Sequence, residues 1–211
     1  MKKTIALLIV LCIVIGGAFA SFKVGLQFGY GGFSLNARKD ANNYLKIDNG
    51  GWYAAAVGEY VLMDGLTAKA ELGANGLGLD TYRGFVDGVS YSHEIADTQV
   101  SLHFNAYAGV QFAFDLFGDI QMGIGAGADV MVGKEGSSTS DSFNIAFGPA
   151  GELVLLFGNF SNSFNFFIGG KTSWYLVNTD KTLGTGYKDL GSEPSISYLA
   201  YKFFGGMTYE F

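Results

Sequence analysis

Residues 99–114 read QVSLHFNAYAGVQFAF and alternate almost without exception between polar and apolar side chains. Successive side chains of a β-strand point to opposite faces, so one face of this segment is apolar and the other is polar. A soluble antiparallel sheet turns its apolar face toward a core and its polar face toward water. A transmembrane β-barrel reverses this arrangement, because its apolar face meets lipid and its polar face lines the lumen.

Seven further segments alternate in the same way, which predicts eight strands in all. The eight runs are residues 22–30, 52–62, 66–75, 99–114, 120–132, 143–155, 164–176 and 198–211. Most of these runs are longer than the strands of soluble proteins, which typically have about 5–6 residues. They match the about 9–11 residues that a tilted strand needs to cross a bilayer. Pro149 lies inside the sixth run, and we expect a β-bulge there because proline has no amide hydrogen to donate.

The links between these runs alternate strictly in length. Short links are expected at 64–65, 116–118 and 158–163, and long polar links at 32–50, 78–97, 134–142 and 177–194. Outer-membrane barrels have short periplasmic turns and longer external loops. The links therefore favour an all-β, eight-stranded, antiparallel, up-and-down transmembrane β-barrel with both ends on the periplasmic side.

Charged residues fall on the polar faces of the predicted strands and are balanced, with four cations and four anions. They are Lys23, Glu59, Lys69, Glu71, Asp129, Glu152, Lys171 and Lys202. Solvated surface charges would not need to balance, whereas charges buried in a narrow lumen must pair. We therefore expect the polar face to be the inside, with pairs between neighbouring strands, such as Lys69 with Glu59 and Lys171 with Glu152, forming a closed ionic plug.

The N-terminus predicts a cleaved secretory signal peptide over residues 1–20, followed by a barrel domain over residues 21–211. Lys2 and Lys3 precede an apolar run that ends in Ala18-Phe19-Ala20, a small-residue cleavage pattern. The only cysteine, Cys12, lies within this run, so disulfides, thiolate metal sites and cysteine catalysis are not expected in the mature chain.

Charge and hydropathy exclude two further classes of protein. Loss of the two lysines changes the formal net charge from −6 to −8, which argues against nucleic acid as a partner. No later segment approaches 18 consecutive apolar residues, which argues against a helical membrane protein.

The chain ends in GGMTYEF, in which Met207, Tyr209 and Phe211 alternate. This ending is similar to the carboxy-terminal signature of bacterial outer-membrane proteins, which implies recognition by the barrel-insertion machinery. Together with the eight runs, the whole expected mature chain resembles the small eight-stranded outer-membrane barrels of the OmpA-, OmpX- and OmpW-like families. The resemblance implies contact with outer-membrane lipid and a location in the outer membrane of a diderm bacterium.

The motifs give no support for an enzyme. GIGAGA at 123–128 matches a dinucleotide-binding pattern, but it continues a strand and no helix follows. Ser101 and His103 share one face of a strand about 6.6 Å apart, too far for a direct hydroxyl–imidazole hydrogen bond. His93 has no second histidine near it to form a metal site. We expect no catalytic residues, no metal and no cofactor.

Two functional hypotheses remain. The first is a structural and interaction role, adhesin-like, in which the external loops contact a host or environmental ligand. Its candidate residues lie in the second long link, where a hairpin with its tip at Asp87-Gly88 is expected: Tyr82, Phe85, Asp87, Gly88 and Tyr91. The alternative is an OmpW-like carrier or narrow channel for small hydrophobic molecules, with Tyr175, Val177 and Tyr198 at the outer end of the lumen. Lipid-interface aromatic residues are the simpler interpretation of these three positions.

Overall fold

Nine strands make up almost all of the described structure. The computed structural model describes residues 21–40, 43–86, 89–93, 101–134, 143–161, 163–176 and 195–211. The strands are β1 (Phe22–Asp40), β2 (Asn43–Met63), β3 (Leu66–Val86), β4 (Val89–His93), β5 (Ser101–Phe117), β6 (Ile120–Lys134), β7 (Phe143–Ser161), β8 (Phe164–Tyr175) and β9 (Ser195–Glu210). In this part of the chain, no helix is long and apolar enough to cross a membrane.

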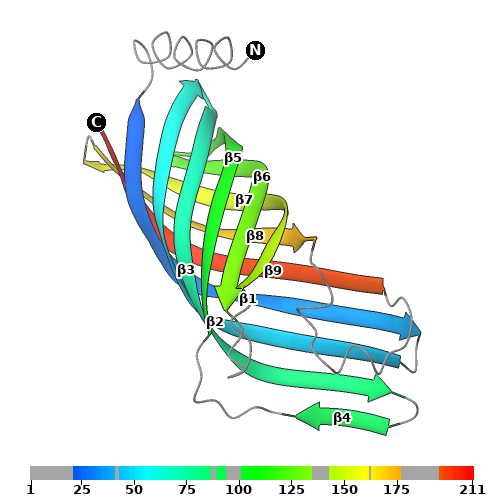
Figure 1. Ribbon diagram of the computed structural model, residues 1–211. Helices are drawn as coiled ribbons and strands as arrows, with labels where there is room; N and C mark the ends of the chain where they lie inside the picture. The colour runs from blue at the N-terminus through cyan, green and yellow to red at the C-terminus, as the bar shows by residue number, and fades with distance from the viewer. Residues whose placement is uncertain are drawn as a thin grey trace, which may run out of the picture.

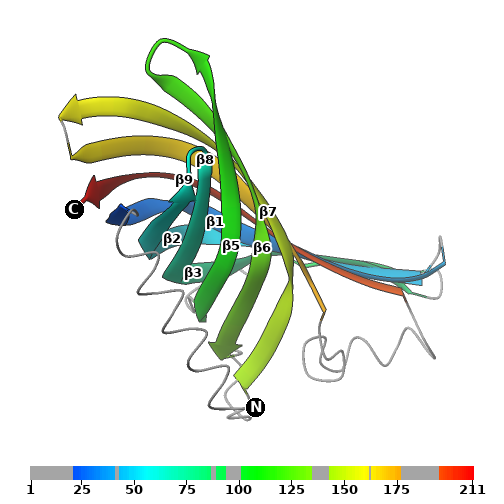
Figure 2. The ribbon, with the colours of Figure 1, turned by 90° about the horizontal axis from the view of Figure 1, so that it is seen from above.

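Eight of the strands form a closed antiparallel barrel, viewed along two directions in Figures 1 and 2. Each barrel strand pairs with its neighbours in chain order, and β1 pairs with both β2 and β9, so that the sheet has no gap between its first and last strands. The short strand β4 stands outside this ring and pairs with the far end of β3. The predicted eight-stranded barrel is confirmed, and a ninth short strand is added to it.

The polar face of the opening segment is the inside of the barrel. Leu102, Phe104 and Phe112 are exposed on the outer surface, whereas Asn105 and Gln111 are buried in the interior. The same alternation holds along the other barrel strands, because side chains two residues apart share a face. The barrel therefore presents an apolar wall outward and encloses the polar side chains.

Aromatic residues gather at two levels of this wall. At one level, the ring centroids of Phe22 and Phe211 lie 6.5 Å apart, and those of Tyr209 and Phe211 lie 5.0 Å apart. At the other level, Tyr30 and Tyr201 stack at 6.5 Å. Tyr201 on β9 and Phe211, the residue after β9, are ten positions apart. This is about 33 Å of extended chain, or about 25 Å of height at a tilt of about 40°. This height matches the apolar band of a membrane barrel.

One side of the barrel continues well beyond the other. The pairing of β3 with β5 ends at Leu77 and Ser101, but β1, β2, β3 and β9 go on pairing beyond this point, and β4 lies along the edge of β3. The register shifts once between β2 and β3, at Asp48–Asn49, and once between β1 and β2, after Arg38. Figure 1 shows these strands running past the rest of the wall. We call this extension the projecting sheet and define it as residues 32–40, 43–50, 78–86, 89–93 and 195–197.

The projecting sheet corrects two of the predicted long links. Residues 32–50 were expected to form a loop, but β1 continues to Asp40, which pairs with Asn43. Most of 78–97 is likewise strand, with Val86 opposite Val89 in the β3–β4 hairpin. The expected hairpin pairing is therefore present, while its expected tip, Asp87-Gly88, lies outside the described residues. The links at 135–142 and 177–194 and the expected signal peptide also lie outside them.

The expected bulge at Pro149 is wrong. Pro149 lies opposite Ala128 in an unbroken β6–β7 register. On its other side, Ala150 pairs with Ser173, and Phe147 forms an isolated bridge with Leu176 in the same register. The missing amide hydrogen thus interrupts the hydrogen-bonded ladder between β7 and β8 without inserting a residue. The expected turn at 158–163 is also shorter than predicted, because β7 extends to Ser161.

Candidate functional site: the charged lumen

All eight charged residues predicted for the lumen lie on inward-facing positions. Lys23 is partly exposed at the mouth of the barrel, where its Nζ lies 3.3 Å from a carboxylate oxygen of Glu210. The other seven are buried: Glu59, Lys69, Glu71, Asp129, Glu152, Lys171 and Lys202. Ionised groups are costly to bury unless they are paired, so their partners decide what the lumen can do.

The first of two ionic clusters joins three strands through Lys69 and Lys171. Lys69 Nζ lies 2.9 Å from Glu152 Oε2 on β7 and 3.2 Å from Glu71 Oε1 on its own strand. Lys171 Nζ on β8 donates to Glu71 Oε2 and lies 3.7 Å from the centroid of the Tyr107 ring. Two lysines and two carboxylates therefore neutralise one another in the middle of the barrel. We call these four residues the central cluster.

The second cluster surrounds Asp129 on β6. Its Oδ2 accepts hydrogen bonds from Lys202 Nζ at 2.9 Å, Ser173 Oγ at 2.7 Å and Tyr175 Oη at 2.8 Å. The Lys202 ammonium also lies 5.2 Å from the centroid of the Tyr53 ring. One carboxylate thus gathers donors from two other strands, β8 and β9.

The partners in both clusters differ from the prediction. Neighbouring-strand pairs were expected, and Glu59–Lys69 and Glu152–Lys171 do lie opposite each other in the ladders. The strand register does not decide the ion pairs, however, because the lysine side chains reach across the lumen instead. β8 lies four strands from β3 in either direction around the ring. The Lys171–Glu71 pair therefore connects opposite walls, which is feasible because an eight-stranded barrel is only wide enough for side chains to fill.

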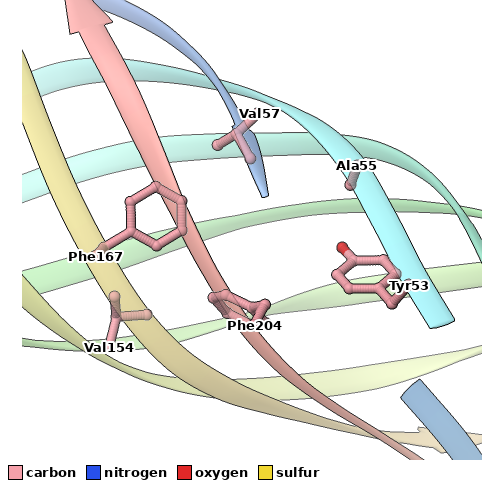
Figure 3. Close-up of a cluster of buried hydrophobic side chains, with 6 residues drawn as sticks. All are labelled: Tyr53, Ala55, Val57, Val154, Phe167 and Phe204. Carbon is pink, nitrogen blue, oxygen red and sulfur yellow. The ribbon is translucent and has the colours of Figure 1, made fainter. Parts of the chain in front are cut away.

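An apolar cluster that the sequence analysis missed packs beside the central cluster. It contains the six side chains in Figure 3, which come from β2, β7, β8 and β9: Tyr53, Ala55, Val57, Val154, Phe167 and Phe204. Tyr53 links this group to the charges, because it accepts a hydrogen bond from Gln27 Nε2 at 2.6 Å and donates to Glu71 Oε2 at 3.1 Å. The alternation of side chains along β2 could have identified three of them, since Tyr53, Ala55 and Val57 point to the same face as Glu59.

Aromatic side chains fill the lumen beyond the Asp129 cluster, on the side of the projecting sheet. Tyr175 and Tyr198 point inward and are buried, with ring centroids 5.2 Å apart. This is the inner-face position that the carrier hypothesis gave them, and the simpler interpretation as lipid-interface residues is wrong for both. Phe33 lies edge-on to Tyr198 at 5.1 Å and 6.4 Å from the His103 ring. Val177 and the side chain of Ser101 lie outside the described part of the structure.

The opposite end of the lumen opens into a cavity of about 540 Å³ whose lining includes Ser21 and Glu210. We call this cavity the terminal vestibule. Its lining includes one lysine, Lys23, and four carboxylates: Glu59, Asp64, Asp115 and Glu210. Among the described residues, no group of three or more His, Cys, Asp or Glu side chains is placed to hold a metal ion.

The other predicted positions lie outside the lumen. Met207, Tyr209 and Phe211 face outward on β9 and the residue after it. Tyr82 and Phe85 lie on β3 in the projecting sheet, and Tyr91 lies opposite Gly84 on β4.

Comparisons with known proteins agree on the fold. No protein-family model matches the chain, and a search of curated proteins also finds no match. Among solved structures, Neisserial surface protein A is similar over 91% of this chain and 99% of its own, with 14% identity and a TM-score of 0.54. The outer membrane protein OprG from Pseudomonas aeruginosa covers 90% of this chain and 95% of its own, with 12% identity and a TM-score of 0.54. The outer membrane protein AlkL covers 91% and 90%, with 14% identity and a TM-score of 0.50. The chain thus has the fold of the small eight-stranded outer-membrane barrels.

Proposed function

We propose that this chain is an integral outer-membrane β-barrel whose role is to hold the projecting sheet beyond the membrane, as a structural and interaction (adhesin-like) surface. The observation that carries the proposal is the continuation of β1, β2, β3 and β9 past the barrel wall. A barrel that served only as a membrane plug would not need this sheet. Ser21, the first described residue, and Phe211 lie at the opposite rim, where Lys23 pairs with Glu210 across β1 and β9, and we assign that rim to the periplasm.

The outward surface supports the membrane location. Large apolar side chains are exposed all around the barrel, among them Leu26, Phe104, Ile124, Leu153, Ile168 and Phe203. A soluble protein rarely exposes an apolar surface of this extent. Two aromatic levels flank this band at the separation that a bilayer requires.

The lumen supports a structural role over a transport role. The central cluster and the Asp129 cluster connect opposite parts of the wall, so we propose that they form a plug without a sustained pore. No catalytic activity is part of this proposal. The alternative, a carrier or narrow channel for small hydrophobic molecules, would need free space where Tyr175 and Tyr198 are buried against each other.

The test removes the projecting sheet and leaves the barrel. Residues 32–50 and residues 78–100 would each be replaced by Asn-Gly, a favoured two-residue hairpin turn, which retains the pairs Gly31–Gly51 and Leu77–Ser101. The variant should assemble in the outer membrane like the parent and lose attachment of intact cells to host-cell or matrix surfaces. As a control at the other end of the barrel, Asp64→Asn places the same Asn-Gly sequence in the turn between β2 and β3 and should leave attachment unchanged. Equal attachment by parent and shortened variant would refute the proposed role.

A further inference from the structure

Glu59 is a buried carboxylate for which no hydrogen bond or close ion pair is formed with the residues that the structure describes, although Lys69 and Lys23 attract it from a longer distance. Its side chain lies on β2 between Lys23 on β1 and Lys69 on β3, directly opposite both in the ladders. Yet the ammonium of Lys23 contacts Glu210, and that of Lys69 contacts Glu71 and Glu152. Both neighbouring lysines therefore make their close contacts with other carboxylates, while Glu59 is only 9% exposed.

The charge balance of the buried residues leads to the same carboxylate. Lys69, Lys171 and Lys202 supply three buried positive charges, whereas Glu59, Glu71, Asp129 and Glu152 supply four negative charges. The central cluster and the Asp129 cluster use all three lysines. The unmatched negative charge is thus that of Glu59, and it faces the terminal vestibule.

A second buried acceptor faces the same cavity. Gln111 on β5 is 5% exposed, and its Oε1 accepts no hydrogen bond from the described residues. An acceptor left unpaired in a buried position costs free energy, and an N–H donor in the cavity would satisfy it. The carboxylate and the amide oxygen therefore call for the same kind of ligand group, one that carries both positive charge and N–H donors.

We propose that the terminal vestibule binds a linear aliphatic di- or polyammonium ion. One ammonium group would donate to Glu59 and Gln111 at the inner end of the cavity, and another would interact with rim carboxylates such as Asp115. Apolar lining side chains, including Val61 and Leu156, would contact the methylene chain. A tightly bound metal ion fits less well, since no described group of three acidic or imidazole ligands surrounds this point.

The experiment measures spermidine binding to the refolded full-length chain in detergent micelles by isothermal titration calorimetry. We expect saturable binding at one site. Glu59→Gln removes the charge-assisted hydrogen bond and should weaken binding about tenfold or more. Lys23→Met removes the competing ammonium at the mouth and should strengthen binding. Asp48→Asn makes the same charge change as Glu59→Gln but lies in the projecting sheet, so its binding should match that of the parent.

Two further measurements keep the test decisive. Gln111→Leu should weaken binding several-fold, and it serves in place of Glu59→Gln if that variant does not refold. Propylamine, which has a single ammonium group, should bind more weakly than spermidine. The proposal is wrong if the parent does not bind spermidine, if Glu59→Gln and Gln111→Leu both bind it like the parent, or if Mg²⁺ at equal charge concentration displaces it completely.

Discussion

Lys69→Met tests the ionic architecture of the lumen most sharply, because Lys69 is the only described ion-pair partner of Glu152. Its ammonium lies 2.9 Å from Glu152 Oε2, and the side chains of both residues are 1% exposed or less. Glu71, by contrast, keeps Lys171 when Lys69 is lost. The substitution therefore leaves one buried carboxylate unpaired and one still paired.

The expected loss of stability follows from this geometry. With an effective dielectric constant of about 20, unit charges about 3 Å apart attract by about 6 kcal/mol. Water and side-chain rearrangement offset part of this energy, and removal of one partner of a buried pair typically costs about 3–5 kcal/mol. We expect a loss in this range for Lys69→Met. Glu152→Gln should cost less, because Lys69 would still pair with Glu71 at 3.2 Å.

The assay is urea unfolding of the refolded barrel in lipid vesicles, followed by tryptophan fluorescence. The double variant Lys69→Met/Glu152→Gln removes both charges and should recover about 2–3 kcal/mol relative to the sum of the single losses. Lys23→Met is the control, since the exposed Lys23–Glu210 pair should contribute about 1 kcal/mol or less. The reasoning is refuted if Lys69→Met costs no more than Lys23→Met, or if the two single losses simply add.

Three other predictions concern the barrel as a whole. Because every backbone group in a closed barrel is paired, unheated and boiled samples should migrate differently on a denaturing gel, and identical migration after refolding would count against the barrel. Phe211→Ala should lower the yield of membrane-assembled protein in cells, as measured by fractionation, whereas assembly at the level of the parent would argue against a role for the C-terminal signature. Gly29→Ala should destabilise the barrel by about 1–3 kcal/mol, because a Cβ at position 29 would meet the backbone oxygen of Phe203. Gly58→Ala is its matched control, since a Cβ at position 58 meets only the tip of the Phe22 ring near 4 Å, and equal urea midpoints for the two variants would contradict the prediction.

The barrel could be predicted from sequence because its wall separates two environments. Lipid on one side and a polar lumen on the other require alternation of period two, as residues 99–114 display. The same reasoning located all eight lumen charges on inward-facing positions. It also indicated where the wall ends, although the exact strand ends differ by several residues.

The projecting sheet was not predicted, although part of its sequence does alternate. Leu35 and Ile47 stand at one parity and Asn36 and Lys46 at the other. The length and the many polar residues of 32–50 instead favoured a long external link. In the structure one face of this segment is partly buried, since Leu35 is 1% and Asn49 is 4% exposed. The ion-pair partners were missed for a different reason: strand register fixes where a Cα lies, but a lysine side chain is long enough to reach the opposite wall of a narrow barrel.

The most direct test of the proposed plug is the conductance of the unmodified protein in planar lipid bilayers. If the central cluster and the Asp129 cluster close the lumen, insertion of the refolded barrel should produce no sustained conductance. Lys69→Met under identical conditions should show water-filled openings and measurable current. A steady, large conductance from the unmodified protein would contradict the plug and favour a transport role.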